Sequence, residues 1–225
     1  MNLSAREQLL DLLATVSFRL GEFTLSSGAK SDYYIDCRTT TLHAHGAALT
    51  GQVFLDLFRQ QDWQADAVGG LTLGADPIVV ATAVVSSQGG APVHGFLVRK
   101  AEKAHGMGRR LEGFQEKDAR VVIVDDVCTT GSSTIQAIEA AREFGFNIVG
   151  VACLVERLEA KGRGAVEQAA APAKFISTFT SDDVKAAHLR LKQNREMFAY
   201  SGPCEVCGRP AVTNSPRLRC AAHQP

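Results

Sequence analysis

The stretch V-V-I-V-D-D-V-C-T-T-G-S-S-T, residues 121–134, places two adjacent carboxylates where an apolar run meets a loop of small hydroxyl residues. Backbone N–H groups and hydroxyls at the start of a helix form a binding site for an anion. Asp125 and Asp126 would repel that anion unless they have partners of their own, either neutral hydroxyl groups or a divalent cation. A phosphorylated sugar meets both requirements. The alternative is an acid pair that only caps a strand-to-helix turn.

Short apolar runs alternate with helical patterns on both sides of this stretch. The alternation predicts an α/β fold in which parallel strands are joined by right-handed crossovers. In such sheets ligands bind beyond the carboxyl ends of the strands, where Asp125 and Asp126 are expected to lie. The predicted strands cover 67–70, 93–98, 120–125 and 147–155, and the predicted helices cover 46–61, 75–87 and 132–144.

The N-terminal region carries two further local signals. Ser4 and Glu7 form a capping box for a helix whose apolar pattern continues to about Gly21. The segment F-T-L-S-S-G-A-K-S-D-Y-Y-I-D, residues 23–36, then predicts two short strands around a Ser-Gly turn.

The length and composition limit the number of domains and the classes of partner. With 225 residues, 24 Lys and Arg and 24 Asp and Glu, the chain fits one α/β domain with an appendage. Its balanced charge offers no overall attraction to nucleic acid. No apolar run approaches the ~20 residues of a membrane span, and the N-terminus lacks a signal-peptide pattern. We therefore expect a cytoplasmic protein that binds neither nucleic acid nor a membrane.

The composition changes near residue 201, at Ser-Gly-Pro, where we place a domain boundary. Before it the pattern predicts an Ala-rich helix, a strand at F-I-S-T and a final helix that Thr180 or Ser181 caps. The predicted domains are therefore 1–200 and 201–225.

The C-terminal segment 201–225 has the spacing of a zinc-binding motif. The candidate ligands form two pairs separated by twelve residues, Cys204 with Cys207 and Cys220 with His223. Four such ligands satisfy tetrahedral Zn²⁺ and leave no open coordination position, so the predicted zinc is structural. The alternative is a set of unliganded thiols.

The segment R-K-A-E-K-A-H-G-M-G-R-R-L-E-G, residues 99–113, contains six basic residues and three glycines. It has almost no apolar content and therefore no core to join. A long connection of this kind inside a compact domain is more often a functional lid than a packing element. A solvated basic surface turn is the alternative.

Residues 121–134 resemble the signature with which type I phosphoribosyltransferases bind phosphoribosyl pyrophosphate (PRPP). The segment R-K-A-E-K-A-H-G (99–106) is similar to the mobile catalytic loop of the orotate phosphoribosyltransferase family, and S-S-G-A-K-S-D-Y-Y-I-D (26–36) is similar to its N-terminal hairpin. V-E-R at 155–157 places an arginine where that family contacts the base. The resemblance covers about residues 4–190. It implies the type I phosphoribosyltransferase fold, with a central parallel sheet flanked by helices, an N-terminal hairpin or hood and a mobile catalytic loop.

The resemblance implies a role for each residue that matches these motifs. The acid pair would hold the ribose hydroxyls, the loop after it would bind the 5-phosphate, and the lid would close over the pyrophosphate. The implied catalytic residues are Lys103, His105 and Asp126. The residues implied to bind PRPP are Arg99, Lys100, Lys103, His105, Asp125, Asp126, Val127, Cys128, Thr129, Thr130, Gly131, Ser132 and Ser133. Those implied to contact orotate are Lys30, Thr129 and Arg157, although Arg157 could instead be a surface arginine at a helix start.

The implied reaction transfers the 5-phosphoribosyl group from PRPP to orotate and gives orotidine 5′-phosphate and pyrophosphate. Positive charge develops on the sugar and negative charge on the leaving group, a need that Mg²⁺ and Lys103 would meet. The resemblance also implies a homodimer whose lids reach the neighbouring subunit's site. The alternatives are a phosphoribosyltransferase for another base, which Lys30 and the lysine-rich lid disfavour, and a PRPP-binding regulator, which the intact lid residues disfavour.

One segment departs from the family pattern. Many members carry a Tyr-Lys pair in the loop that binds pyrophosphate, but this chain has G-G-L-T-L-G-A-D-P, with Leu73 and Gly74 at those places. The backbone N–H groups of 72–75 are therefore expected to bind pyrophosphate. Asp76 is expected to approach Mg²⁺ through water.

Two kinds of isolated residue receive structural interpretations. Cys128 lies in the phosphate loop, but displacement at C1 by orotate needs no covalent enzyme intermediate, so a small filler is favoured over a nucleophile. His43 and His45 precede a helix, where a capping or surface role is favoured over a metal site.

Overall fold

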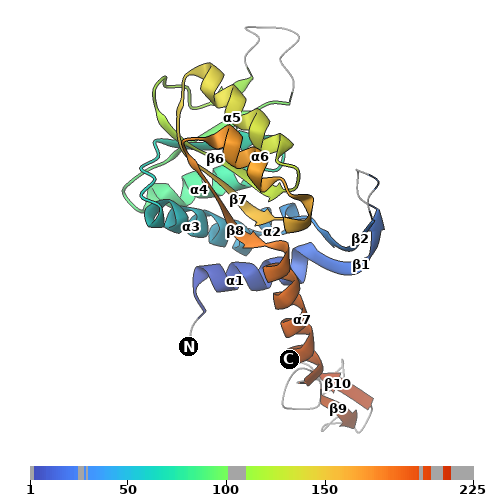
Figure 1. Cartoon of the computed structure of the whole chain (residues 1–225). Coiled ribbons are helices and arrows are strands. Elements are labelled where there is room, and N and C mark those ends of the chain that lie inside the picture. Colours follow the sequence, from blue (N-terminus) through green and yellow to red (C-terminus); the bar gives the residue numbers. More distant parts are fainter. Residues whose placement is uncertain are drawn as a thin grey trace.

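A six-stranded sheet forms the centre of the protein in this computed structural model (Figure 1). The structure describes residues 3–24, 28, 30–100, 110–197, 200–203 and 210–213. Neighbouring strands run parallel except at one edge, where β5 is antiparallel to β4. The strands, in their order across the sheet, are β5 (Leu111–Gly113), β4 (His94–Val98), β3 (Ala67–Leu71), β6 (Arg120–Cys128), β7 (Asn147–Glu156) and β8 (Lys174–Thr180).

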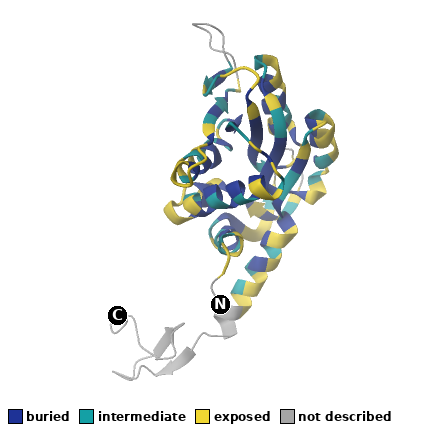
Figure 2. Cartoon of the chain, turned by 90° about the vertical axis from the view of Figure 1, so that its left-hand side faces the viewer, coloured by how far each residue is buried: buried dark blue, intermediate teal, exposed yellow. Residues whose placement is uncertain are grey.

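Helices cover both faces of the sheet, because its central strands are apolar on both sides. In β6, Val122 and Val124 belong to one hydrophobic cluster, whereas Val121 and Ile123 belong to the other. Figure 2 shows these strands as the buried layer of the fold. The first cluster includes residues of α1 (Ala5–Leu12), α3 (Ala44–Gln60), α4 (Asp76–Gln88) and α7 (Ser181–Met197), and the second includes residues of α5 (Ser132–Phe144) and α6 (Arg163–Ala170).

The strand order reverses between β3 and β6. The chain leaves β3 for β4 on one side and later returns to β6 on the other side, which is the kind of switch point where α/β sheets bind ligands. The pairing of β3 with β6 ends at Gly69 and Ile123, while β6 stays paired with β7 as far as Cys128. The sequence predicted that this strand ends at residue 125. The acid pair therefore lies inside the last part of β6 rather than after it.

The N-terminal region contains a hairpin, as predicted, but its first strand begins earlier than expected. The capping box of Ser4 and Glu7 is present at the start of α1. The helix ends through a π-helical turn, η1 (Leu13–Ser17), and β1 (Phe18–Thr24) then pairs with β2 (Lys30–Ile35). The predicted continuation of the helix to Gly21 was wrong, because Phe18 is buried against the stacked ring of Tyr33 at 5.3 Å.

Several short elements were not predicted, and the structure tests two predicted helix caps. Elements α2 (Arg38–Thr41), η2 (Leu158–Ala160) and β5 span four, three and three residues, which is too short to show a period. The Nδ1 atom of His43 accepts a hydrogen bond from the Gly46 N–H at 3.3 Å, so the predicted capping role is confirmed. At the start of α7, the Thr180 hydroxyl accepts a hydrogen bond from the Asp183 N–H at 3.1 Å.

The C-terminal segment contains a small antiparallel pair, β9 (Tyr200–Pro203) with β10 (Pro210–Thr213). The four candidate zinc ligands, Cys204, Cys207, Cys220 and His223, lie outside the described residues. The zinc site and the domain boundary at 201 therefore remain predictions. Among the helices that the structure describes, none is long and apolar enough to cross a membrane.

Candidate active site

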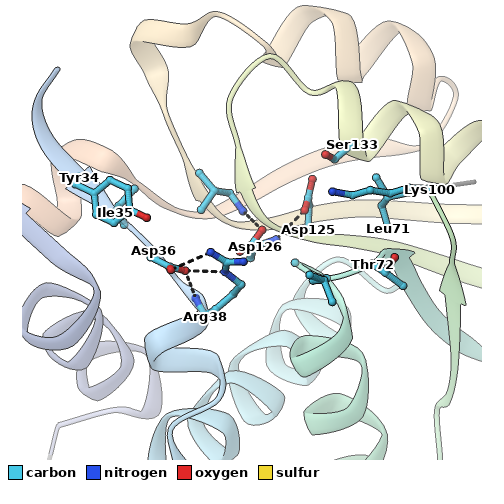
Figure 3. A pocket seen from close by; sticks show the side chains of 13 residues that line it. Tyr34, Ile35, Asp36, Arg38, Leu71, Thr72, Lys100, Asp125, Asp126 and Ser133 are labelled. Carbon is cyan, nitrogen blue, oxygen red and sulfur yellow. Dashed lines mark hydrogen bonds and ion pairs between the residues drawn. The ribbon is translucent and has the colours of Figure 1, made fainter. Parts of the chain in front are cut away.

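A pocket of about 240 Å³ opens at the switch point, beyond the carboxyl ends of β3 and β6 (Figure 3). Segments distant in the sequence meet there: the end of β6 and the start of α5, the turn between β3 and α4, Lys100 two residues after β4, and the segment from β2 into α2. The residues that line the pocket include Asp36, Arg38, Thr72, Leu73, Lys100, Asp125, Asp126 and Ser133.

The acid pair forms one wall of this pocket. Asp125 is 4% exposed. Its carboxylate accepts hydrogen bonds from the Thr134 hydroxyl at 2.8 Å and from the Asp126 N–H at 3.0 Å. Asp126 accepts one from the Val127 N–H at 2.9 Å. These bonds fix the orientation of both carboxylates at the pocket wall.

Burial determines the protonation of the acid pair. Loss of hydration, followed by the negative charge of Asp126, raises the pKa of Asp125 to about 7. Burial also raises the pKa of Asp126, and the positive charge of Arg38 opposes that rise. A group that donates hydrogen bonds or carries positive charge would therefore be stabilised here. Sugar hydroxyls are donors of this kind.

The turn from β6 into α5 leaves an open helix N-terminus beside the acids. Gly131 is the N-cap and has φ +80°, and no side chain caps this end of α5 among the residues described. A Cβ atom at Gly131 would overlap Val166 of α6, so the turn packs tightly on its inner side. On its outer side Thr129, Thr130, Ser132 and Ser133 are exposed. The predicted anion site thus has N–H groups and hydroxyls available to a ligand.

The turn from β3 into α4 lies on the other side of the acid pair. It includes a cis peptide bond between Thr72 and Leu73. A Cβ atom at Gly74 would overlap the carboxylate of Asp126. Position 74 therefore accepts a side chain only if the Asp126 carboxylate or the turn moves. Asp76 does not line the pocket, but its Oδ1 atom is buried without a hydrogen-bond partner and burial raises its pKa.

The four residues predicted to form the lid do not share one position. Lys100 lines the pocket of its own chain. Arg99 instead lies near Glu112 of the edge strand β5, at 3.4 Å. Lys103 and His105 lie outside the described residues.

Comparisons with known proteins agree with this geometry. Residues 70–192 match the family model described as the phosphoribosyl transferase domain. The orotate phosphoribosyltransferase of Corynebacterium glutamicum (strain R) is 48% identical over 157 residues, which are 70% of this chain and 83% of that protein. The chain belongs to the orotate phosphoribosyltransferase family.

Solved structures of orotate phosphoribosyltransferases show the same fold. The Mycobacterium tuberculosis H37Rv enzyme in complex with Fe(III) dicitrate has a TM-score of 0.70 and 39% identity, covering 80% of this chain and 99% of that chain. The same enzyme in complex with PRPP has a TM-score of 0.64 and 32% identity, covering 82% and 93%. The predicted type I phosphoribosyltransferase fold is thereby confirmed.

Arg157, which the resemblance places at the base, is buried. Arg157 is 7% exposed, so its interpretation as a surface arginine was wrong. Its Nε atom donates to the Tyr33 hydroxyl at 2.9 Å and to Glu159 at 3.0 Å, and the guanidinium lies over the Tyr33 ring. The Tyr33 hydroxyl also donates to Glu159. Hairpin and sheet are thus joined at this arginine, and Lys30 is exposed at the start of β2.

Near the site, one residue agrees with the sequence analysis and another was not found by it. Cys128 is 1% exposed and lies in the hydrophobic cluster under α5, as expected of a small filler. Arg38 lines the pocket beside Asp126 and was missed. The only sequence signal for it was its place three residues after the hairpin motif Y-Y-I.

Proposed function

We propose that this protein is an orotate phosphoribosyltransferase that makes orotidine 5′-phosphate and pyrophosphate from orotate and PRPP. One observation supports the proposal most strongly: the acid pair and the open N-terminus of α5 share one pocket edge. That edge offers hydrogen-bond acceptors for ribose hydroxyls next to donors for a phosphate. PRPP carries both groups on one ribose.

In the proposed reaction the bond between C1 and the pyrophosphate oxygen breaks and pyrophosphate leaves with the electron pair. A bond forms between C1 and a ring nitrogen of orotate, which gives up its proton. Asp125 and Asp126 orient the sugar through its hydroxyls, while residues 129–133 hold the 5-phosphate. Arg157, Thr129 and Lys30 orient orotate. Lys100, Lys103 and His105 approach the pyrophosphate, where their positive charge offsets the charge that develops on the leaving group.

We propose Mg²⁺ as the cofactor. Among the described residues, no group of three or more His, Cys, Asp or Glu side chains could hold a metal ion, so the ion would enter with the phosphates of PRPP. The carboxylates of Asp125 and Asp126 at the pocket wall are the hard oxygen donors that Mg²⁺ prefers. When bound, the ion would neutralise part of the pyrophosphate charge.

Three further properties belong to this proposal. The protein would be a homodimer whose lids contribute to shared active sites, which light scattering after size-exclusion chromatography tests by mass. Its location would be the cytoplasm, which cell fractionation tests. The segment 201–225 would bind one structural Zn²⁺ through Cys204, Cys207, Cys220 and His223. Metal analysis of the purified protein should then give about one zinc per chain, and a Cys207→Ser variant should lose it.

An assay that follows orotate consumption with PRPP and Mg²⁺ tests the function. The wild type should turn over orotate, and Lys103→Ala should lower kcat by about 100-fold or more, because it removes a cation at the leaving group. Lys117→Ala is the matched control, since Lys117 lies on the surface before β6. Turnover of a purine base instead of orotate would indicate the other transferases. PRPP binding without any turnover would indicate a regulator.

A further inference from the structure

The pocket lacks a positive side chain at the turn where pyrophosphate is expected to bind. That turn offers Thr72, Leu73 and Gly74, and Gly74 cannot be replaced by a larger residue without overlap with Asp126. Pyrophosphate is strongly anionic, and backbone N–H groups offset only part of its charge. A positive group should therefore come from another element of the pocket wall.

Arg38 is placed to be that group. It begins α2, directly after the fully buried Cys37, so its backbone is held by the core. Its side chain is 46% exposed and lines the pocket. Figure 3 shows the guanidinium between Asp36 and Asp126. Gly74 lies close to the same carboxylate, because a Cβ atom built on it would be 2.3 Å from Asp126 Oδ1.

Asp36 orients this guanidinium and leaves part of it open. The Nε atom donates to Oδ1 at 2.9 Å, and one terminal nitrogen donates to Oδ2 at 3.0 Å. The Arg38 N–H also donates to Oδ1 at 3.1 Å. A guanidinium has five N–H donors in a fixed plane, so the fork on Asp36 leaves donors for a phosphate oxygen.

An anion is favoured beside the acidic wall of the pocket only where a positively charged side chain also lines that wall. Asp125, Asp126 and Asp36 line the wall, and the basic residues among the described lining are Arg38 and Lys100. Figure 3 shows these two entering from different sides of the acid pair. A ligand held between them would be bracketed by positive charge.

We propose that Arg38 binds the pyrophosphate group of PRPP and replaces the lysine that is absent from the turn at 72–74. The inference rests on the proposed function. Arg38 is then a substrate-binding residue outside the motifs at 26–36, 99–106, 121–134 and 155–157. It would contact the leaving group rather than the carboxylate of orotate.

Calorimetry with inorganic pyrophosphate and Mg²⁺, together with steady-state kinetics, tests this role. Arg38→Met should weaken pyrophosphate binding and raise the KM for PRPP by about 10-fold to 100-fold, as expected for loss of charge-assisted hydrogen bonds. The KM for orotate should change by less than about 2-fold, because no orotate contact is lost. Arg38→Lys should show an intermediate loss, since lysine keeps the charge but not the fork.

Arg59→Met is the matched control. Arg59 forms a similar ion pair with Asp56 at 2.8 Å on the outer side of α3, away from the pocket. Its removal should leave all three constants unchanged. Leu73 is 65% exposed at the pocket, so Leu73→Lys in the Arg38→Met background should restore part of the pyrophosphate affinity.

Three results would overturn the inference. These are unchanged pyrophosphate affinity in Arg38→Met, a loss confined to orotate, or an equal loss in Arg59→Met. Should Arg38→Met fail to fold, Arg38→Lys with wild-type pyrophosphate affinity and wild-type KM values would overturn it as well. Failure of the proposed function would look different, because the wild type itself would not consume orotate.

Discussion

Two strand-to-helix turns flank the acid pair, and they are built in different ways. The turn from β6 to α5 presents side chains, the exposed hydroxyls of Thr129, Thr130, Ser132 and Ser133, next to the two carboxylates at the end of β6. The turn from β3 to α4 presents mainly backbone, with a cis peptide and a glycine pressed against Asp126. The first turn has a recognisable sequence, whereas the second depends on close approach of the main chain. The difference teaches that a backbone site is sensitive to added volume rather than to lost polar groups.

The largest effect should come from adding one methyl group to the backbone turn. Gly74→Ala would place a Cβ atom on the Asp126 carboxylate, so either the turn or the acid must move. A shift of about 1 Å in a catalytic site can cost 100-fold, and we expect kcat/KM to fall by about that factor. Gly164→Ala is the control, because a Cβ atom there meets nothing within 4 Å. Full activity in Gly74→Ala would remove the contrast between the two turns.

The turn from β6 to α5 also has one position that cannot accept a larger residue. Gly131→Ala would combine a positive φ with overlap on Val166, and we expect a loss of about 2 kcal/mol or more in the free energy of unfolding. Gly145→Ala, at the other end of α5, has a similar positive φ but only a distant contact with Lys117 at 3.9 Å. Chemical denaturation should show a smaller loss for Gly145→Ala. Equal losses would mean that strain, and not packing on α6, limits this turn.

The acid pair makes stability depend on pH. The pKa of Asp125 is about 7 in the folded protein and near 4 in the unfolded chain, so the folded protein binds the proton more tightly. The free energy of unfolding contributed by this group therefore falls as pH rises from about 4 to 7. Without ligands, Asp125→Asn should be more stable than the wild type above pH 7, by about 1–3 kcal/mol, and the difference should vanish near pH 4.

Denaturation curves at several pH values measure this effect. Asp56→Asn, at a partly exposed surface pair with Arg59, is the control variant. A stability difference for Asp125→Asn that stays constant with pH would show that the native carboxyl group is not shifted.

The smallest effect concerns the base side of the pocket. Tyr33→Phe removes the hydroxyl that Arg157 and Glu159 share, while the ring under the guanidinium remains. We expect the KM for orotate to rise by about 2-fold to 10-fold, as for loss of one hydrogen bond, with pyrophosphate affinity unchanged. An equal loss for both ligands would show that the hairpin supports the whole pocket and not the base side alone.

The sequence could predict those features that follow from the type of a side chain or from a repeating pattern. The acids, the hydroxyl loop and the alternation of strands and helices follow from side-chain type and period, and the family motifs identify Arg157. Arg38 could not be found in this way, because one arginine after a hairpin has no pattern and α2 is four residues long. The start of β1 was misjudged because Leu20 continues the apolar pattern of the helix, and the stacking of Phe18 on Tyr33 cannot be read from the sequence.

The pairing of β6 with β7 limits the length of the ligand that the site accepts. Cys128 lies opposite Glu156, and the Arg157 N–H donates to the Cys128 carbonyl at 2.9 Å. The groups proposed to recognise the two ends of a nucleotide, the phosphate turn and the base arginine, thus leave adjacent strands at the same level. Parallel strands rise about 3.3 Å per residue, so the pairing register fixes the distance between these two groups. Loops that extend beyond the sheet can change in length while the distance between the phosphate turn and Arg157 stays the same.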